Sequence, residues 1–355
     1  MLSRPKKRIL RQNRRMKKFK DNITGIEYFI VHACVETICF YLLRLHYPLL
    51  LAGTIAFVYD FFAFLPQGII GKFIESHKKL PYETIGNLLM LGAIFLVASP
   101  VHALHISGYV VLGIGNAIMH ECGAIATVTE SRGKIFQSAL FVSGGGVGIV
   151  IGQTMGINQV PWQWLIIPAV LSEACALAAR KSVRKGTYPT FNVVEKKFSP
   201  WTILLVAFLV TAVRSYLGYA IPISWNKELW QTILLFGIMG LGKALGGYFV
   251  DRIGAWKTAV FSTLAAIPFL IFGDKIMVVS VIGVFFFSMT MSITFAMCLS
   301  ILKSSPGLAF GVTTAALFIG LVPAFFVRFG LLTNAILIVI LSIACCVLLS
   351  KTLKK

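Results

Sequence analysis

Long apolar runs, separated by short polar gaps, fill almost the whole chain. Most runs are close to 20 residues long, the length that an α-helix needs to cross the hydrocarbon core of a bilayer. Because backbone polar groups in lipid must bond within their own segment, these runs predict helices rather than strands. The twelve predicted spans are 25–43, 48–71, 83–99, 103–128, 134–156, 162–179, 200–222, 229–250, 256–273, 276–302, 307–329 and 331–350.

The composition indicates that lipid, rather than water, surrounds most of the chain. Of its 355 residues, 57% are hydrophobic and only 13% are charged, whereas about 25% of the residues of soluble domains are charged. All seven cysteines lie within apolar runs, and none shows a CxxC spacing. They are therefore predicted to be small buried side chains, and the sequence implies no disulfide, no metal site and no cofactor.

The basic residues are concentrated in alternate gaps and near the chain ends. The formal net charge is +20, and most of the 33 Lys and Arg residues lie within 1–20, 72–80, 132–134, 180–197 and 351–355. Lys and Arg accumulate in the cytoplasmic loops of membrane proteins. The distribution therefore predicts a multi-pass protein of the inner (cell) membrane with both termini in the cytoplasm. Nucleic acid is not an expected partner, because no soluble domain remains to present the charge.

A hydrophilic stretch after the sixth predicted span divides the chain into two related halves. Gly71-Lys-Phe-Ile-Glu75 in the first half matches Gly247-Tyr-Phe-Val-Asp251 in the second, and Glu36 aligns with Arg214 at nearly the same offset. Internal repetition of this kind is a mark of a repeated architecture. The predicted domains are a basic tail (1–24), a six-helix bundle (25–180), a cytoplasmic linker (181–199), a second six-helix bundle (200–350) and a basic tail (351–355).

The segment that ends the second span of each half resembles a known family signature. Gly247-Tyr-Phe-Val-Asp251-Arg252-Ile-Gly254 is similar to the loop signature G-x-x-x-D-R-x-G of the major facilitator superfamily. The first-half copy departs from it, with Glu75 in place of Asp, Ser76 in place of Arg and Lys78 in place of the final Gly. The resemblance covers the whole chain in topology. It implies an all-α polytopic membrane protein with twelve transmembrane helices in two pseudo-symmetric six-helix bundles, the major facilitator fold.

A narrower resemblance comes from residues 112–152. GNAIMHECG, followed by SRGKIFQSALFVSGGGVGIVIG, is similar to the fosmidomycin-resistance branch of the superfamily, although the usual Pro is missing after His120. The small residues of the second segment predict a helix that its neighbours approach closely. The branch implies export and does not specify a substrate.

The superfamily resemblance assigns a gating role to residues near the cytoplasmic ends of the helices. Charge pairs there are expected to latch one state while the two halves rock about a central site. The predicted gating residues are Gly71, Glu75, Arg132, Gly247, Asp251, Arg252 and Gly254.

Ionisable residues within the spans are the candidates for the central site. Each costs about 2.5–3.5 kcal/mol at the bilayer centre and therefore usually faces a cavity or a partner. Tyr28, His32 and Glu36 recur every four residues on one face of the first span. In superfamily members the first, fourth, seventh and tenth spans line the cavity, so the resemblance places most of the candidates around one space. The candidates are Glu36, Arg214, His120, Glu121, Asn116, His32 and Asp60.

Two interpretations of the charged candidates stay open. In the first, Arg214 binds an anionic or polar group of the substrate and neutralises Glu36 or Glu121. A carboxylate that alternates between burial and an Arg partner then carries a proton, because burial favours its neutral form and the Arg its charged form. In the second, the same groups form a static buried ion pair that holds the halves together.

The remaining candidates also have alternatives. His120 either titrates near physiological pH or only forms hydrogen bonds within the bundle. Asp60 is expected to pair with Lys243 or with a hydroxyl group in a structural role.

Together these features predict a secondary active transporter. We expect a monomer in the lipid bilayer that moves a small organic or drug-like solute by alternating access, with protons as the coupling ion and export as the direction. The alternatives are an importer or facilitator of a small anionic metabolite and a non-transporting membrane sensor. An enzyme is not expected, because HECGA lacks the second His of HExxH and the sequence has neither GxSxG nor a Walker-type phosphate loop.

Overall fold

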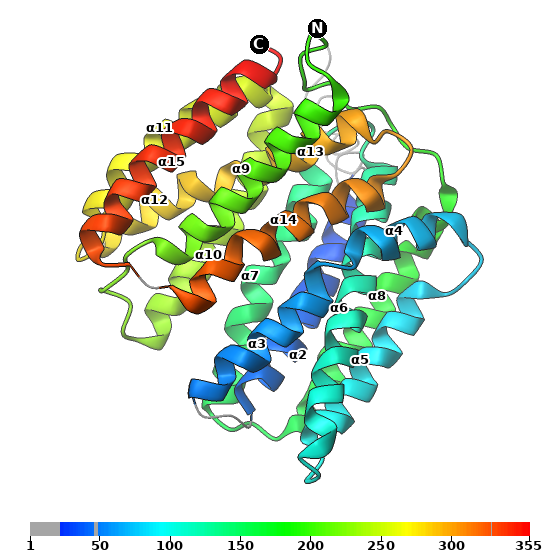
Figure 1. The fold of residues 1–355 in the computed structure, drawn as a ribbon. Coiled ribbons are helices and arrows are strands. Elements are labelled where there is room, and N and C mark those ends of the chain that lie inside the picture. Colours follow the sequence, from blue (N-terminus) through cyan, green and yellow to red (C-terminus); the bar gives the residue numbers. More distant parts are fainter. Residues whose placement is uncertain (1–21, 46–48, 328) are drawn as a thin grey trace, which may run out of the picture.

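The computed structural model describes residues 22–45, 49–327 and 329–355. The predicted N-terminal tail (1–24) therefore lies almost entirely outside the described residues. Within them the chain is helical apart from its loops and an antiparallel bridge between Val194 and Leu353 (Figure 1). Eleven segments of this part of the chain are long and apolar enough to cross a membrane, and Tyr82–Ala98 is a shorter apolar helix of 17 residues. Each corresponds to one predicted span.

The helices form the two predicted bundles. The N-terminal half contains α2 (Ile23–Leu45), α3 (Leu49–Phe64), α4 (Gln67–Ser76), α5 (Tyr82–Ala98), α6 (Ala103–Glu130), α7 (Phe136–Ile157), the short helix η1 (Trp162–Leu165) and α8 (Ile166–Lys185). The C-terminal half contains α9 (Pro200–Ala220), α10 (Leu229–Ile253), α11 (Ala255–Phe272), α12 (Met277–Met289), α13 (Met291–Ile301), α14 (Pro306–Phe326) and α15 (Leu331–Thr352). The halves meet where α7 packs on α10 and where α3 and α4 pack on α14 (Figure 1).

Two of the predicted spans are each built from two consecutive helices. In the second span, α3 gives way to α4 at Pro66, because proline lacks a backbone donor and its ring clashes with the preceding turn. In the tenth span, α12 gives way to α13 at Thr290. There the Phe287 carbonyl oxygen accepts hydrogen bonds from two side-chain donors, the Arg214 guanidinium and the Thr290 hydroxyl, which lie outside the regular backbone pattern of a helix. Each pair of helices still makes one crossing.

The linker between the halves begins later than predicted. It was expected at 181–199, but α8 continues to Lys185. Arg184 and Lys185 in its last turn complement the negative end of the helix dipole. Gly186 then ends the helix with a φ of 65°, a left-handed conformation that glycine adopts at little cost.

The C-terminal segment is tied to the linker rather than extending as the predicted tail (351–355). Helix α15 runs to Thr352, and the residues after it pair with the linker in an antiparallel β-bridge. Lys354 N–H donates to Val193 O, and Glu195 N–H donates to Thr352 O, both at 2.9 Å. Residues 186–199 and 353–355 therefore share one end of the molecule, which we call the linker end.

A stripe of glycines explains why α7 packs tightly on α2. At every fourth position, a Cβ atom on α7 would overlap a backbone carbonyl oxygen of α2. Small residues allow such close helix contacts in membranes. The pairs are Gly144 with Phe29, Gly148 with Ala33, and Gly152 with Thr37.

Candidate functional site

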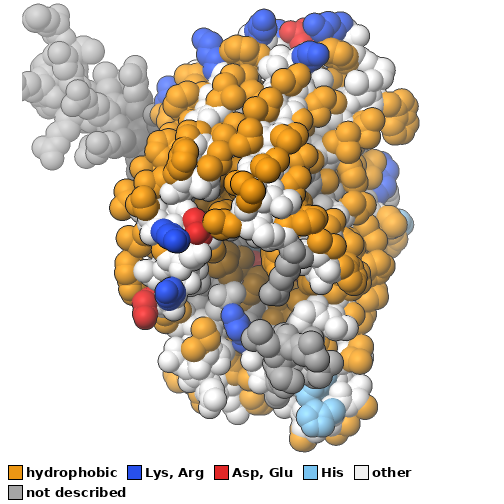
Figure 2. Space-filling view, turned by 60° about the vertical axis from the view of Figure 1, so that its left-hand side comes forward, with side chains coloured by type: hydrophobic (Ala, Val, Ile, Leu, Met, Phe, Trp, Pro, Cys, Tyr) orange, Lys and Arg blue, Asp and Glu red, His pale blue; other side chains and the backbone are white. Residues whose placement is uncertain are grey.

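A cavity of about 210 Å³ lies between the two halves. Its walls come from α2, α3, α6 and α7 of the N-terminal half and from α9, α10, α13 and α14 of the C-terminal half. Figure 2 shows hydrophobic side chains over most of one face, Lys and Arg gathered at the upper (linker) end, and a hollow below the middle. The polar residues that line the cavity are His32, Glu36, Tyr59, Asp60, His120, Ser138, Thr211, Lys243, Ser292, Thr294, Thr313 and Thr314.

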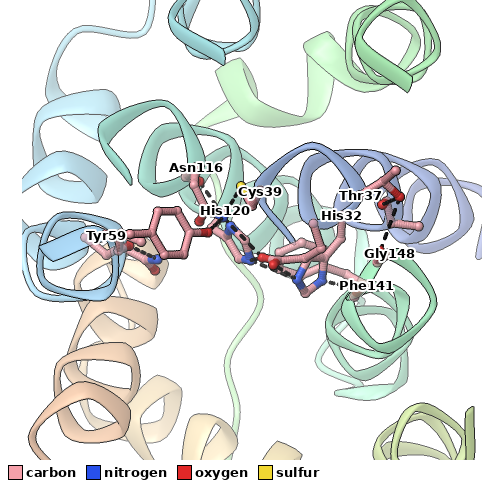
Figure 3. Close-up of polar contacts among 12 residues, drawn as sticks. His32, Thr37, Cys39, Tyr59, Asn116, His120, Phe141 and Gly148 are labelled. Carbon is pink, nitrogen blue, oxygen red and sulfur yellow. Dashed lines mark hydrogen bonds and ion pairs between the residues drawn. The ribbon is translucent and has the colours of Figure 1, made fainter. Parts of the chain in front are cut away.

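A compact polar group on the cavity wall consists of His32, Glu36 and His120. Figure 3 shows the side chains of His32 and His120 turned toward each other. The Nε2 atoms of the two histidines are 2.9 Å apart. Glu36 Oε1 lies 3.6 Å from each of them. His32 and Glu36 are one turn apart on α2, and His120 reaches them from α6. The structure thus brings together three of the predicted cavity residues.

Hydrogen bonds on the other side of the two rings define their tautomers. His32 Nδ1 lies 3.0 Å from the Phe141 carbonyl oxygen, and His120 Nδ1 lies 3.0 Å from that of Asn116. A carbonyl oxygen only accepts, so each Nδ1 carries a hydrogen, and each Nε2 of a neutral ring then presents a lone pair. Two lone pairs that face each other at 2.9 Å beside a carboxylate repel, and a shared proton or a metal ion between them would relieve the repulsion.

Asn116 supports the carboxylate from within the bundle. Its Nδ2 donates to Glu36 Oε1 at 3.1 Å and to the Tyr59 hydroxyl oxygen at 2.7 Å, and Cys39 Sγ lies 3.5 Å away. Asn116 is only 1% exposed. Asn116 thus contacts Glu36 from within the bundle and is not among the residues that line the cavity.

Gly145 on α7 makes room for the His32 ring. A Cβ atom on Gly145 would lie 2.6 Å from His32 Nε2 and 2.7 Å from His32 Cε1, much closer than van der Waals contact. Any larger residue here would displace the imidazole. The glycine run therefore shapes the site as well as the packing of α7 on α2.

Asp60 and Lys243 face the same cavity from different halves. Within the described residues, neither side chain takes part in a hydrogen bond or an ion pair, so the predicted pairing of Asp60 with Lys243 or with a hydroxyl group is not seen. Asp60 comes from α3 and Lys243 from α10, so each half contributes one of these two ionisable side chains to the cavity wall.

Arg214 lies apart from the other cavity candidates, contrary to the prediction that it shares their space. Its guanidinium donates to the Phe287 carbonyl and lies 4.2 Å from the centroid of the Phe287 ring. It lines a separate small cavity of the C-terminal half together with Thr290 and Cys345. The break between α12 and α13 provides the carbonyl that holds this buried cation. Lys243 is the basic residue that the C-terminal half presents to the central cavity.

Glu121 is the neighbour of His120 on α6, but it lies under the crossing of α4 and α14. Its side chain is 0% exposed, and neither carboxyl oxygen has a hydrogen-bond partner among the described residues. A Cβ atom on Gly307 would lie 2.9 Å from Glu121 Oε2, and one on Gly71 would overlap it. An ionised carboxylate buried without a donor is costly, so this setting indicates a protonated carboxyl group.

Glu75, at the end of α4, binds the beginning of α14 in the other half. Its carboxylate accepts from the Gly307 N–H at 2.7 Å and from the Ser305 hydroxyl. One turn earlier, Gly71 crosses Gly307 so closely that a Cβ on Gly71 would lie 2.7 Å from Gly307 Cα. An anionic group at a helix N-terminus is favourable. The linker residue Tyr188 has a pKa raised to about 12, mainly because its phenol is partly buried and also because the negative charge of Glu75 is near it. The phenol therefore stays neutral.

Asp251 makes the pseudo-symmetric contact from the C-terminal half. Its carboxylate accepts from the N–H groups of Ile135 at 2.9 Å and Phe136 at 3.0 Å, where α7 begins. One turn earlier, Gly247 leaves room for Ala139 of α7. Two carboxylates, each one turn after a glycine crossing, thus join the halves at the linker end.

The other predicted gating residues lie nearby with different surroundings. Arg252 is exposed, and its guanidinium lies 5.3 Å from the centroid of the Tyr248 ring. Arg132 is exposed in the turn after α6, with a φ of 53°. Gly254 joins α10 to α11 with a φ of 92°, which explains the final glycine of the signature because side chains disfavour that conformation.

Several residues of the site were not predicted from the sequence. Tyr59 and Gly145 had weak signals, since each stands beside or within a segment that was singled out. Lys243 was visible as a basic residue inside a span, but only as a partner for Asp60. The partners of Glu75 on α14 gave no signal, because Ser and Gly near a helix start are common.

A scan against protein-family models and a search of curated protein sequences each found no match. Among solved structures, the chain is similar to a point variant of the E. coli fucose:proton symporter FucP, with a TM-score of 0.63, 14% identity, and coverage of 93% of this chain and 98% of that chain. It is also similar to the major facilitator superfamily transporter FucP in the outward conformation, with a TM-score of 0.60, 16% identity, and coverage of 93% and 97%. Both of these structures are of transporters. The chain therefore has the fold of major facilitator superfamily transporters.

Proposed function

We propose that this protein is a secondary active transporter that exports a small organic solute in exchange for protons. The observation that carries the proposal is the central cavity, which both halves line and which holds ionisable residues from each half. In a fold of two bundles, rocking of the halves exposes such a cavity to the two sides of the membrane in turn.

The contacts of Glu75 and Asp251 support closure at one end. Each carboxylate belongs to one half and binds the N-terminus of a helix in the other half. Separation of the halves would break both contacts. The positive-inside distribution supports a cytoplasmic linker end, and on this proposal the described state is the one closed toward the cytoplasm.

The cavity wall favours an amphipathic solute. Aromatic and aliphatic side chains, among them Phe40, Phe295 and Phe310, line it together with Asp60 and Lys243. A small organic molecule with one anionic or polar group could place that group at the Lys243 ammonium and its apolar part against the rings. Lys243 thereby takes the role that the sequence suggested for Arg214. The same feature supports the second candidate, an importer of a small anionic metabolite.

Glu121 is well placed to carry the coupling proton. In the described state the Gly71–Gly307 crossing covers its carboxyl group, which has no donor within the described residues. If α4 and α14 separate at the cytoplasmic end, water reaches the group and a proton can leave to the cytoplasm. Glu36, held between two histidines and Asn116, is the alternative carrier.

Transport by purified protein in proteoliposomes tests the proposal. A thermal-stability screen against metabolite and antibiotic libraries supplies a ligand, and counterflow of that ligand in labelled form measures exchange without any gradient. We expect counterflow, and we expect an imposed pH gradient to drive uphill movement. Stabilisation by a ligand without counterflow would indicate a sensor and would sink the transporter proposal.

Three Glu→Gln variants separate coupling from transport. Glu121→Gln and Glu36→Gln are expected to lose pH-driven transport, and the Glu121 variant to keep counterflow. Glu228→Gln, at the exposed start of α10, is the matched control. Undiminished pH-driven transport by both of the first two variants would remove the proton-carrier role and leave the transporter proposal standing.

A further inference from the structure

Three Lewis-basic atoms converge on one point at the wall of the central cavity. They are His32 Nε2, His120 Nε2 and Glu36 Oε1, with separations of 2.9, 3.6 and 3.6 Å. For a triangle with these sides, the point equidistant from the corners lies about 2.0 Å from each. Zinc binds histidine nitrogen at roughly 2.0–2.1 Å and carboxylate oxygen at roughly 2.0–2.2 Å. The spacing therefore suits a metal ion lying in or just above the plane of the three atoms.

The surrounding hydrogen bonds have the form of a metal-site outer shell. A ligating histidine usually donates its other ring N–H to a carbonyl or carboxylate, which fixes the tautomer and directs the lone pair at the metal. Both rings do so here, through the carbonyl groups of Phe141 and Asn116. The Asn116 side chain in turn donates to Glu36. All three candidate ligands are thus held in orientations that leave a lone pair free for a cation.

From this geometry we propose that His32, Glu36 and His120 bind a divalent transition-metal ion such as Zn²⁺ or Co²⁺. Two imidazoles and one carboxylate favour Zn²⁺, Co²⁺ or Ni²⁺ over Mg²⁺ and Ca²⁺, which prefer oxygen ligands. The three side chains face the cavity, so water or a donor group of a solute can complete the coordination. The inference does not depend on transport, because binding is measurable in detergent.

The rest of the cavity wall is compatible with a dication. Asp60 is a second carboxyl group on the wall beside Glu36, and Lys243 on α10 is the basic group there. Gly145 keeps the space beside His32 Nε2 free, since a Cβ there would lie 2.6 Å from that atom. A proton shared by the two histidines is the rival occupant of the same point, and a metal ion must displace it to bind.

Metal titration of the full-length protein in detergent tests the proposal. After treatment with a chelator, the protein is titrated with Co²⁺ and with Zn²⁺ by calorimetry, and bound metal is counted by elemental analysis. We expect one equivalent at micromolar or tighter Kd. His32→Ala and His120→Ala should each weaken binding by about 100-fold or more, since loss of an outer-shell partner alone costs 10–100-fold. His77→Ala, an exposed histidine outside the site, is the control and should bind as the native protein does.

A second measurement uses only the native chain, in case the histidine variants fail to fold. X-ray absorption at the zinc edge of the one-equivalent complex should show two imidazole nitrogens and light oxygen ligands. A sulfur shell would point instead to buried cysteines such as Cys39 and would overturn the assignment. Absence of stoichiometric binding, or binding that survives in the doubly substituted His32/His120 protein, would overturn it as well.

Discussion

The two carboxylate contacts at the linker end share a geometry but differ in their donors. Asp251 accepts from two backbone N–H groups at the start of α7. Glu75 accepts from one backbone N–H and from the Ser305 hydroxyl at the start of α14. The reason lies in Pro306, the first residue of α14, which has no N–H to offer. The Glu75 side chain is longer than that of Asp and reaches past Pro306 to the Gly307 N–H. Glu in place of the signature Asp therefore goes together with a proline at the start of the helix that it contacts.

The difference shows that a signature residue is best interpreted together with the helix it faces. The Glu75 contact is also more enclosed, because Gly71 and Gly307 cross above the buried carboxyl group of Glu121. At the Asp251 crossing, a Cβ on Gly247 would overlap the Ala139 methyl group and would lie 3.3 Å from Phe136 Cα. We therefore expect the Glu75 side to control access to a proton site and the Asp251 side to supply more of the electrostatic closure.

The largest effect is expected from adding a side chain at the tighter crossing. In Gly71→Val the new Cβ would lie 2.7 Å from Gly307 Cα, and overpacking of this kind costs about 1–3 kcal/mol. The closed state should lose roughly 5–150-fold in population, and transport should fall in proportion. Spin labels on Lys72→Cys and Lys303→Cys, exposed positions on either side of the contact, report closure by pulsed EPR.

Two variants serve as references for this experiment. Gly237→Val should change nothing, since a Cβ there meets no atom within 4 Å. Gly247→Ala should have a smaller effect than Gly71→Val, because it adds one carbon atom at its crossing instead of three, although its Cβ would also overlap the Ala139 Cβ. Equal closure in Gly71→Val and the native protein would show that this crossing does not form in the membrane.

The second effect concerns charge at the less enclosed contact. Asp251→Asn keeps the shape but removes the anion from the N-terminus of α7, where such a charge contributes up to about 2 kcal/mol. The closed population should fall roughly 5–30-fold on the same EPR pair. The closed population of Glu75→Gln should fall less, because its amide oxygen can accept from the Gly307 N–H while its NH2 group donates to the Ser305 hydroxyl oxygen. In Asp251→Asn, by contrast, one of the two backbone N–H groups faces an amide NH2 group. The reverse order would contradict the distinction drawn between the two contacts.

The sequence predicted the fold more completely than the site. Twelve apolar runs and alternating basic gaps are properties of each segment alone, so the helices followed directly. Arg214 shows the limit, because its alignment with Glu36 placed it near the middle of a span but could not reveal the Phe287 carbonyl that holds it.

The histidine pair shows the same limit in the opposite direction. His32 and Glu36 form a recognisable pair one turn apart, whereas the distance to His120 depends on how α6 packs against α2. That packing is governed by tertiary contacts, among them the room that Gly145 leaves for the imidazole. His32 and His120 are 88 residues apart in the sequence. No local sequence pattern could therefore indicate that the distance between their ring nitrogens suits a metal ion.

A smaller effect tests the role of proline in the comparison. Pro306→Ala would give α14 a free N–H at its first position, and Glu75→Asp would shorten the acceptor. We expect Glu75→Asp alone to weaken closure by about 0.5–1 kcal/mol, as one hydrogen bond is worth. The double variant should recover most of that loss, since it recreates the arrangement at Asp251. A double-mutant cycle on the EPR pair measures the coupling, and purely additive effects would refute the explanation.

The smallest effect involves a carboxylate that caps a loop within one half. Asp274 accepts from the Ser224 N–H at 3.0 Å and the Ser224 hydroxyl at 2.6 Å, both in loops of the C-terminal half. These hydrogen bonds hold the pKa of Asp274 below its ordinary value. A carboxyl group whose pKa is lower in the folded state stabilises the protein above the unfolded pKa of about 3.9 and loses that contribution as pH falls through the folded pKa.

Asp274→Asn should therefore lower the apparent melting temperature by about 2 °C or less at pH 7, and the difference should shrink as pH falls below about 3.9 and vanish below the folded pKa of Asp274. Because Asp274 and Ser224 lie in the same half, the variant should leave the EPR closure signal unchanged. Thermal unfolding in detergent across this pH range, together with the EPR pair, checks both expectations. A shift in closure equal to that of Asp251→Asn would mean that any lost carboxylate cap loosens the molecule. The contacts between the halves would then have no special part in gating, so this variant decides whether the effect of Asp251 depends on its crossing from one bundle to the other.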